Sequence, residues 1–128
     1  MNNLLKQGYT VVDEETLYVV QTEGQSYYKI GHTNRPSQRL SALQVGCPFP
    51  LKFAMIKLMP KNQAAKLERR LHLVFSQYRT GGEWFMIPPR IWGHARRRIE
   101  EIADEASKRV SDQIKFFSPP RVFEKSVL

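Results

Sequence analysis

Residues 17–33, LYVVQTEGQSYYKIGHT, carry the strand and turn signals from which the fold is predicted. Residues 17–22 and 27–31 are both rich in β-branched and aromatic side chains, which is typical of strands. Between these two runs lie residues 23–26, which include a glycine and predict a short turn. Residues 17–33 therefore predict a β-hairpin, to which the other expected elements are added.

Downstream of the hairpin, apolar spacing predicts helices and one further strand. Pro36 suits the first turn of a helix. The expected elements are a helix after Pro36, a strand over residues 51–59, a helix over 62–78, an extended segment over 83–87 and a long helix from 88 to about 110. This order predicts a small single α+β domain, with a central three-stranded antiparallel sheet flanked by helices and a long C-terminal helix.

Length and composition limit the class of protein. A chain of 128 residues fits one domain, which we expect at residues 16–110, between an N-terminal lead-in (1–15) and a C-terminal tail (111–128). The single cysteine excludes an internal disulfide framework and a cysteine-based zinc finger. No apolar run approaches the ~20 residues of a membrane span, and no secretory signal is visible. We therefore expect a soluble cytoplasmic protein without a membrane partner.

Positive charge is concentrated in one part of the chain, although the whole chain carries a net +8. Residues 29–98 contain fourteen Lys and Arg but only two acidic residues, Glu68 and Glu83. Such a block is typical of proteins that bind a polyanion, and we expect nucleic acid. The residues predicted to contact nucleic acid are Tyr28, Arg35, Lys66, Arg69, Arg70, Arg96 and Arg97.

Four residues form a candidate site for phosphodiester chemistry: Tyr18 and Lys29 on the hairpin, and Arg39 and Glu68 on the next two helices. A tyrosine or lysine can accept or relay a proton from water. An arginine can hold phosphate oxygens, and a lone carboxylate can hold Mg²⁺ against a substrate phosphate. The pattern thus predicts a Mg²⁺ site at Glu68, where Mn²⁺ can substitute.

Two histidines are further catalytic candidates, namely His32 and His72. His72 follows Glu68 by four residues, so both lie on one face of the predicted helix. Structural interpretations of the site residues remain open. Tyr18 can be an ordinary strand aromatic, and Arg39 can form an ion pair with Glu68.

Four motifs follow one another along the chain: LYVV with YKIGHT, then RLSALQ (39–44), KLERRLH (66–72) and GGEWF (81–85). In this order they resemble the GIY-YIG nuclease superfamily, nearest its phage and meiotically-up-regulated-gene DNA-binding branch, whose second motif reads KIG. The resemblance covers residues 16–88. It implies a compact domain with a three-stranded antiparallel sheet and Mg²⁺-dependent cleavage of DNA, so that the expected partner is double-stranded DNA.

The resemblance also implies roles for individual residues. Tyr18 matches the tyrosine of the first motif, Arg39 the arginine that binds the scissile phosphate, and Glu68 the metal-binding glutamate. The chain departs from the family's motif pattern at two positions. Lys29 stands where most members have a second tyrosine, and Leu43 stands where many have histidine or tyrosine.

Three functions follow from these observations. The first is a Mg²⁺-dependent DNA endonuclease of the GIY-YIG type, a hydrolase of a phage or mobile element, in which Tyr18 or Lys29 accepts a proton or positions water. The alternative is a catalytically silent DNA-binding module or regulator on the same fold. The third is an RNA-binding or protein-interaction domain. A homodimer would bring two sites to a two-fold symmetric target.

Overall fold

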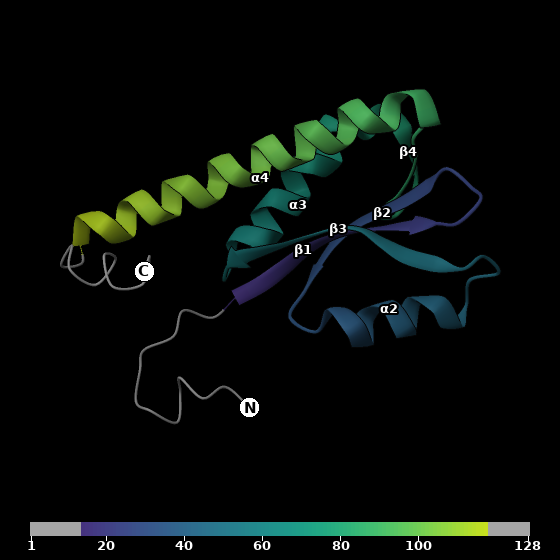
Figure 1. The fold of residues 1–128 in the computed structure, drawn as a ribbon, viewed down its shortest axis with the longest axis horizontal. Helices are drawn as coiled ribbons and strands as arrows, with labels where there is room; N and C mark the ends of the chain where they lie inside the picture. Colours follow the sequence, from purple (N-terminus) through teal and green to yellow (C-terminus); the bar gives the residue numbers. More distant parts are fainter. Residues whose placement is uncertain (1–13, 118–128) are drawn as a thin grey trace.

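The computed structural model describes residues 14–117, with side chains described for residues 15–108. Most of the expected lead-in (1–15) and the end of the expected tail (111–128) lie outside the described residues. Within them, the chain folds as an α+β unit in which one antiparallel sheet lies between helices on its two faces (Figure 1). The predicted α+β class is therefore confirmed.

The sheet has five strands rather than the three that the sequence predicted. They are β1 (Glu14–Thr22), β2 (Tyr27–Thr33), β3 (Leu51–Pro60), β4 (Arg79–Gly81) and β5 (Trp84–Met86), and their order is β3-β1-β2-β5-β4. The two additional strands have three residues each, too few to show an alternating pattern. They form because β5 pairs with β2, and these two strands lie far apart in the sequence.

The predicted hairpin forms the centre of this sheet. β1 and β2 pair antiparallel from Thr16↔Thr33 to Gln21↔Tyr28, and the turn between them includes Gly24 at φ +74°. That backbone conformation favours glycine, as the turn signal in the sequence indicated. β1 also pairs with β3 along its whole length, so it is the most enclosed strand.

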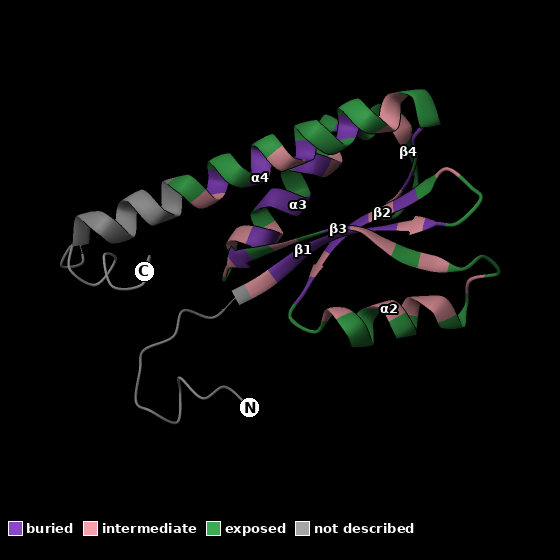
Figure 2. Cartoon of the chain, viewed as in Figure 1, coloured by how far each residue is buried: buried purple, intermediate pink, exposed green. Residues whose placement is uncertain are grey.

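Three α-helices cover the sheet: α2 (Pro36–Val45), α3 (Gln63–Val74) and α4 (Pro89–Phe117), with a 3-10 turn, η1 (Ser76–Tyr78), after α3. Helices α3 and α4 lie over one face and α2 lies over the other (Figure 1). The main core lies beneath α3 and α4, where Leu17, Ile30, Leu71, Phe85 and Ile99 are fully buried. No residue of α2 is buried, and Figure 2 shows this helix without the inward purple stripe of α3 and α4.

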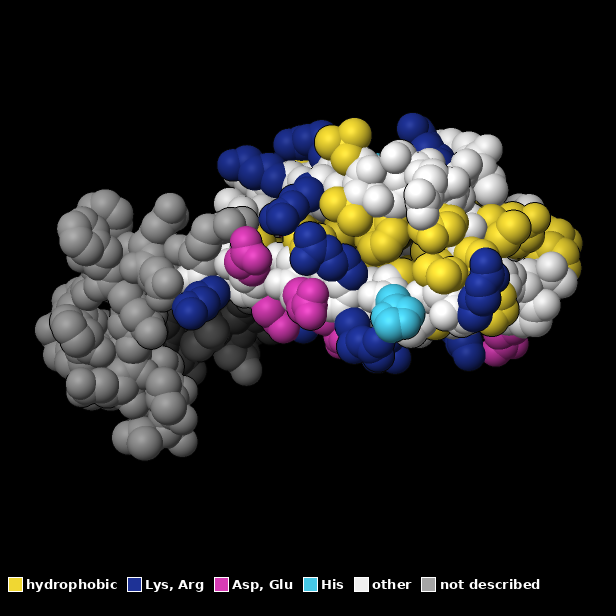
Figure 3. Space-filling view, turned by 90° about the horizontal axis from the view of Figure 1, so that it is seen from above, with side chains coloured by type: hydrophobic (Ala, Val, Ile, Leu, Met, Phe, Trp, Pro, Cys, Tyr) yellow, Lys and Arg dark blue, Asp and Glu magenta, His cyan; other side chains and the backbone are white. Residues whose placement is uncertain are grey.

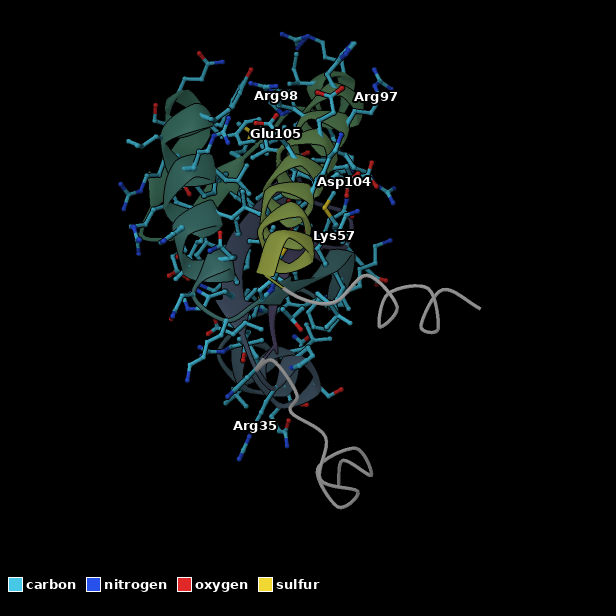
Figure 4. The ribbon with its side chains drawn as sticks, turned by 90° about the vertical axis from the view of Figure 1, so that its left-hand side faces the viewer. Arg35, Lys57, Arg97, Arg98, Asp104 and Glu105 are labelled. Carbon is cyan, nitrogen blue, oxygen red and sulfur yellow. The ribbon has the colours of Figure 1, made fainter. Side chains whose placement is uncertain are left out.

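The last helix is longer than its sequence pattern predicted. We expected an end near residue 110, but α4 continues to Phe117, seven residues past the expected boundary. An ion pair between Lys57 Nζ and Asp104 Oδ1, at 2.8 Å, ties this helix to the edge strand β3 (Figure 4). None of the described helices is both long enough and apolar enough to span a membrane.

Candidate active site

The candidate site lies beside β2, where its pairing with β5 ends. The pairing runs from Tyr27↔Met86 to Lys29↔Trp84, and the Ile30 N–H still donates to the Glu83 carbonyl at 3.2 Å. Beyond that point, the described pairings of β2 are with β1 alone. Backbone next to Gly31 is thus open on one side, with α2 on one face of the sheet and α3 on the other.

Tyr18 lies across Gly31, its partner in the β1–β2 pairing. A Cβ atom built on Gly31 would lie 2.6 Å from the Tyr18 hydroxyl and 2.7 Å from Cζ, closer than real Cβ contacts allow. The glycine of the KIG motif is therefore required here by the close approach of an aromatic ring. Tyr18 is 1% exposed and makes an edge contact with Phe53 at 6.1 Å between ring centroids.

The charge around Tyr18 comes from three other elements. The pKa of Tyr18 is raised to about 12: burial raises it most, Arg39 lowers it, and Glu83 and Glu68 raise it by smaller amounts. These influences place the guanidinium of α2, the carboxylate of α3 and the carboxylate beside β5 within electrostatic range of one phenol. At neutral pH Tyr18 therefore keeps its proton and can donate a hydrogen bond.

Glu68 is held by two histidines. His32 Nδ1 lies 2.6 Å from Glu68 Oε1, and His72 Nε2 lies 3.8 Å from Oε2. His72 Nε2 also lies 2.9 Å from the Ile30 carbonyl oxygen, to which it donates, so its ring is fixed against the strand. Glu68 is 9% exposed, because it lies on the buried side of α3.

Lys29 and Glu83 form an ion pair at the same edge of the sheet. Burial alone would raise the pKa of the Glu83 carboxyl, but the hydrogen bond and charge of Lys29 more than offset this and lower it. Because the Lys29 ammonium donates to Glu83, it is placed to position groups rather than to take a proton. Sequence reasoning missed Glu83 as a site residue, although it was one of the two acids in the basic block.

The two carboxylates, Glu68 and Glu83, fit a divalent cation. Burial raises the pKa of Glu68, the hydrogen bond from His32 lowers it in part, and neighbouring Glu83 raises it again. A cation between such carboxylates would relieve their repulsion, and Mg²⁺ binds proteins through one or two carboxylates plus substrate phosphates. Within residues 15–108 no three His, Cys, Asp or Glu side chains are grouped as a metal site.

A basic groove borders the site on the α2 side. It measures about 250 Å³ and is lined by Thr33, Asn34, Arg35, Gln38, Arg39 and Ala42. Arg35 and Arg39 are exposed, and the loop before them is fixed by the Arg35 N–H, which donates to Thr33 Oγ1 at 3.1 Å. The groove therefore offers two guanidinium groups, the side chains best suited to phosphate oxygens.

The other predicted nucleic-acid contacts lie in three different places. Tyr28 was a wrong prediction: it is 3% exposed and stacks on Trp92 at 4.1 Å, so its ring belongs to the core. Figure 4 places Arg35 beside α2, far from Arg97 on α4. The remaining predicted residues are exposed on helices of the other layer, namely Lys66, Arg69 and Arg70 on α3 and Arg96 and Arg97 on α4.

Comparison with protein families gives one match, to the T5orf172 domain over residues 15–100. The T5orf172 domain is a family distinct from the GIY-YIG superfamily, so the family assignment made from the four motifs is wrong. Neither the curated proteins nor the solved structures give a match. The roles of Tyr18, Arg39 and Glu68 consequently depend on the geometry of the site and not on that resemblance.

Proposed function

The chain belongs to the T5orf172 domain family, and we propose that it is a Mg²⁺-dependent DNA endonuclease that hydrolyses phosphodiester bonds beside β2. The family name specifies no activity, so the proposal depends on the site. Its main support is the convergence of Arg39, Glu68 and Glu83 on the buried phenol of Tyr18 at an open strand edge. Two carboxylates that could hold a cation, next to an arginine that could hold a phosphate, would supply the charge stabilisation that promotes phosphodiester hydrolysis.

Each side chain has a role that its contacts favour. Arg39 holds and neutralises the phosphate from the α2 groove. The Tyr18 hydroxyl, which keeps its proton, donates to the attacking water or to a phosphate oxygen. Lys29 positions Glu83 through their ion pair. Mg²⁺ held by Glu68 and Glu83 would supply electrostatic stabilisation of the charge that develops on the phosphate.

His32 is the side chain best suited to take the proton from water. With its Nδ1–H donating to Glu68, the neutral ring has Nε2 as its acceptor, and the side chain is 35% exposed. A base oriented by a carboxylate is a common arrangement in hydrolases. Tyr18 and Lys29, the two proton acceptors expected from sequence, are then positioning groups.

A catalytically silent DNA-binding module is the second candidate function. It is favoured by the ion pair of Lys29 with Glu83 and by the raised pKa of Tyr18, since both oppose proton acceptance by these two residues. In this case the groove that contains Arg35 and Arg39 binds phosphate without cleavage.

The test is cleavage of supercoiled plasmid in Mg²⁺, in Mn²⁺ and in EDTA. Wild type is compared with Glu68→Gln and with Glu23→Gln, a matched control in the exposed β1–β2 turn. Metal-dependent nicking that persists in Glu23→Gln and falls by at least 10²-fold in Glu68→Gln supports the nuclease. Salt-sensitive DNA binding without cleavage in either metal supports the silent module instead.

A further inference from the structure

A second basic groove lies between α3 and α4. It measures about 140 Å³ and is lined by Gln63, Lys66, Leu67, Arg70 and Ala106. Leu67 and Ala106 are buried and form an apolar floor, while Lys66 and Arg70 are exposed at its border. None of the five lining residues is acidic. Figure 3, which looks onto the helical layer, shows Lys and Arg side chains near exposed hydrophobic ones on this side of the molecule.

Within the part of the chain whose side chains are described, no carboxylate neutralises the two cations of this groove. Lys66 and Arg70 are four residues apart, so they are neighbours on one face of α3, where like charges mildly destabilise a helix. Among the described residues, no carboxylate pairs with either of them. Other exposed arginines do have partners, such as Arg98 with Glu101 at 3.8 Å.

The groove is separate from the candidate active site, because it lies on the opposite flank of α3. With 3.6 residues per turn, the direction of Lys66 and Arg70 is about 160° around the helix axis from that of Glu68 and His72. Glu68 and His72 face β2, whereas the groove faces Ala106 of α4. A phosphate held beside Tyr18 therefore does not occupy the groove.

We infer that the groove between α3 and α4 binds a second, phosphate-type oxyanion, held by Lys66, Arg70 and the Gln63 amide. A guanidinium fork, an ammonium and an amide N–H are donors that together match the oxygens of a phosphate. The oxyanion is either a backbone phosphate of DNA outside the cleavage site or a free phosphate group. This inference concerns binding and does not depend on the nuclease proposal.

The experiment measures binding of a short DNA duplex by fluorescence anisotropy in EDTA, over a range of KCl concentrations. Lys66→Gln and Arg70→Gln are each compared with Arg90→Gln. Arg90 is the matched control, because it is exposed, its loss removes the same charge, and it lines neither basic groove. In parallel, inorganic phosphate is titrated into ¹⁵N-labelled protein, and the backbone amide shifts are followed by NMR.

We expect Lys66→Gln and Arg70→Gln each to weaken duplex binding roughly tenfold and to lower the salt dependence by about one phosphate, with a clearly smaller effect for Arg90→Gln. That result identifies the DNA backbone as the ligand. If inorganic phosphate shifts the amides around Lys66 and Arg70, and both variants abolish the shifts while all three bind DNA alike, the ligand is a free phosphate group. Equal DNA binding by all three variants, with no selective amide shifts, would overturn the inference.

Because DNA binding is measured in EDTA, a failure of the inference about the groove is distinguishable from a failure of the nuclease proposal. A protein without cleavage activity can still show the selective loss in Lys66→Gln and Arg70→Gln. Conversely, metal-dependent cleavage without such selectivity would support the nuclease proposal and overturn only the inference about the groove. All three substituted side chains are exposed, so each variant should keep the wild-type circular dichroism spectrum.

Discussion

Helices α2 and α3 each carry one charged residue of the candidate site, but they are attached to the sheet in different ways. α3 buries Ala64, Leu67, Glu68 and Leu71, whereas α2 buries none of its residues. Glu68 is consequently fixed by the same packing that holds the core together. Arg39 projects from a helix that contributes little to the core. Substitutions in α3 should therefore affect stability and function together, while substitutions in α2 should affect function alone.

The largest expected effect on the free energy of unfolding is that of Leu71→Ala in α3. Leu71 is fully buried in the core, and such truncations cost about 2–5 kcal/mol. Leu43→Ala in α2 should cost less than about 1 kcal/mol, because Leu43 is only partly buried. Urea denaturation followed by circular dichroism measures both values. Equal losses in the two variants would show that α2 is as firmly packed as α3.

Gly31→Ala should have the next largest effect, because it forces a methyl group against the ring of Tyr18. Overpacking of this kind costs about 1–3 kcal/mol. The matched control is Gly46→Ala at the end of α2, where a Cβ meets nothing within 4 Å. The measurement is the shift in thermal midpoint. A shift in Gly31→Ala no larger than in Gly46→Ala would mean that Tyr18 does not lie across this glycine.

A pH-dependent effect on stability is expected from Glu68. Its pKa in the folded state is raised above its ordinary value, so the carboxyl favours folding below that ordinary pKa, and this stability is lost as the pH rises through the folded-state pKa. Glu68→Gln removes the titration. Without metal, the variant should therefore gain stability relative to wild type between pH 4 and pH 8. Urea midpoints across this range give the difference, and a relative loss with rising pH would contradict the sign of the shift.

Much of the fold could be predicted because it depends on local patterns. The turn at Gly24, the strands beside it and the helix of Glu68 all follow from residue spacing and turn chemistry. An extended segment over residues 83–87 was predicted, but the pairing of β5 with Tyr28 and Lys29 is a tertiary contact that the sequence does not show. Strand β4, with three residues, is too short to carry a period and pairs with β5 alone. Tyr28 was assigned to nucleic acid for the same reason, because its stacking partner Trp92 lies far along the chain.

The candidate site was predicted in part. Tyr18, Lys29, His32, Arg39, Glu68 and His72 were named as candidates from residue chemistry, spacing and motif order, and the geometry brings them to one region of the sheet. The link between Lys29 and Glu83 was not foreseen, although Glu83 stood out as an isolated acid in a basic segment. A sequence shows that such an acid is unusual, but only the fold shows which cation it meets.

Arg39→Gln should have the smallest effect on stability and a large effect on function. Arg39 is exposed on α2, so the free energy of unfolding should change by less than about 0.5 kcal/mol. Cleavage at saturating DNA should fall by about 10²-fold, because the guanidinium neutralises charge that develops on the phosphate. Arg90→Gln, at an exposed position near the start of α4, is the control for loss of one positive charge. If Arg39→Gln unfolds the protein or leaves cleavage unchanged, α2 does not supply the phosphate-binding group, and the contrast between the two helices does not hold.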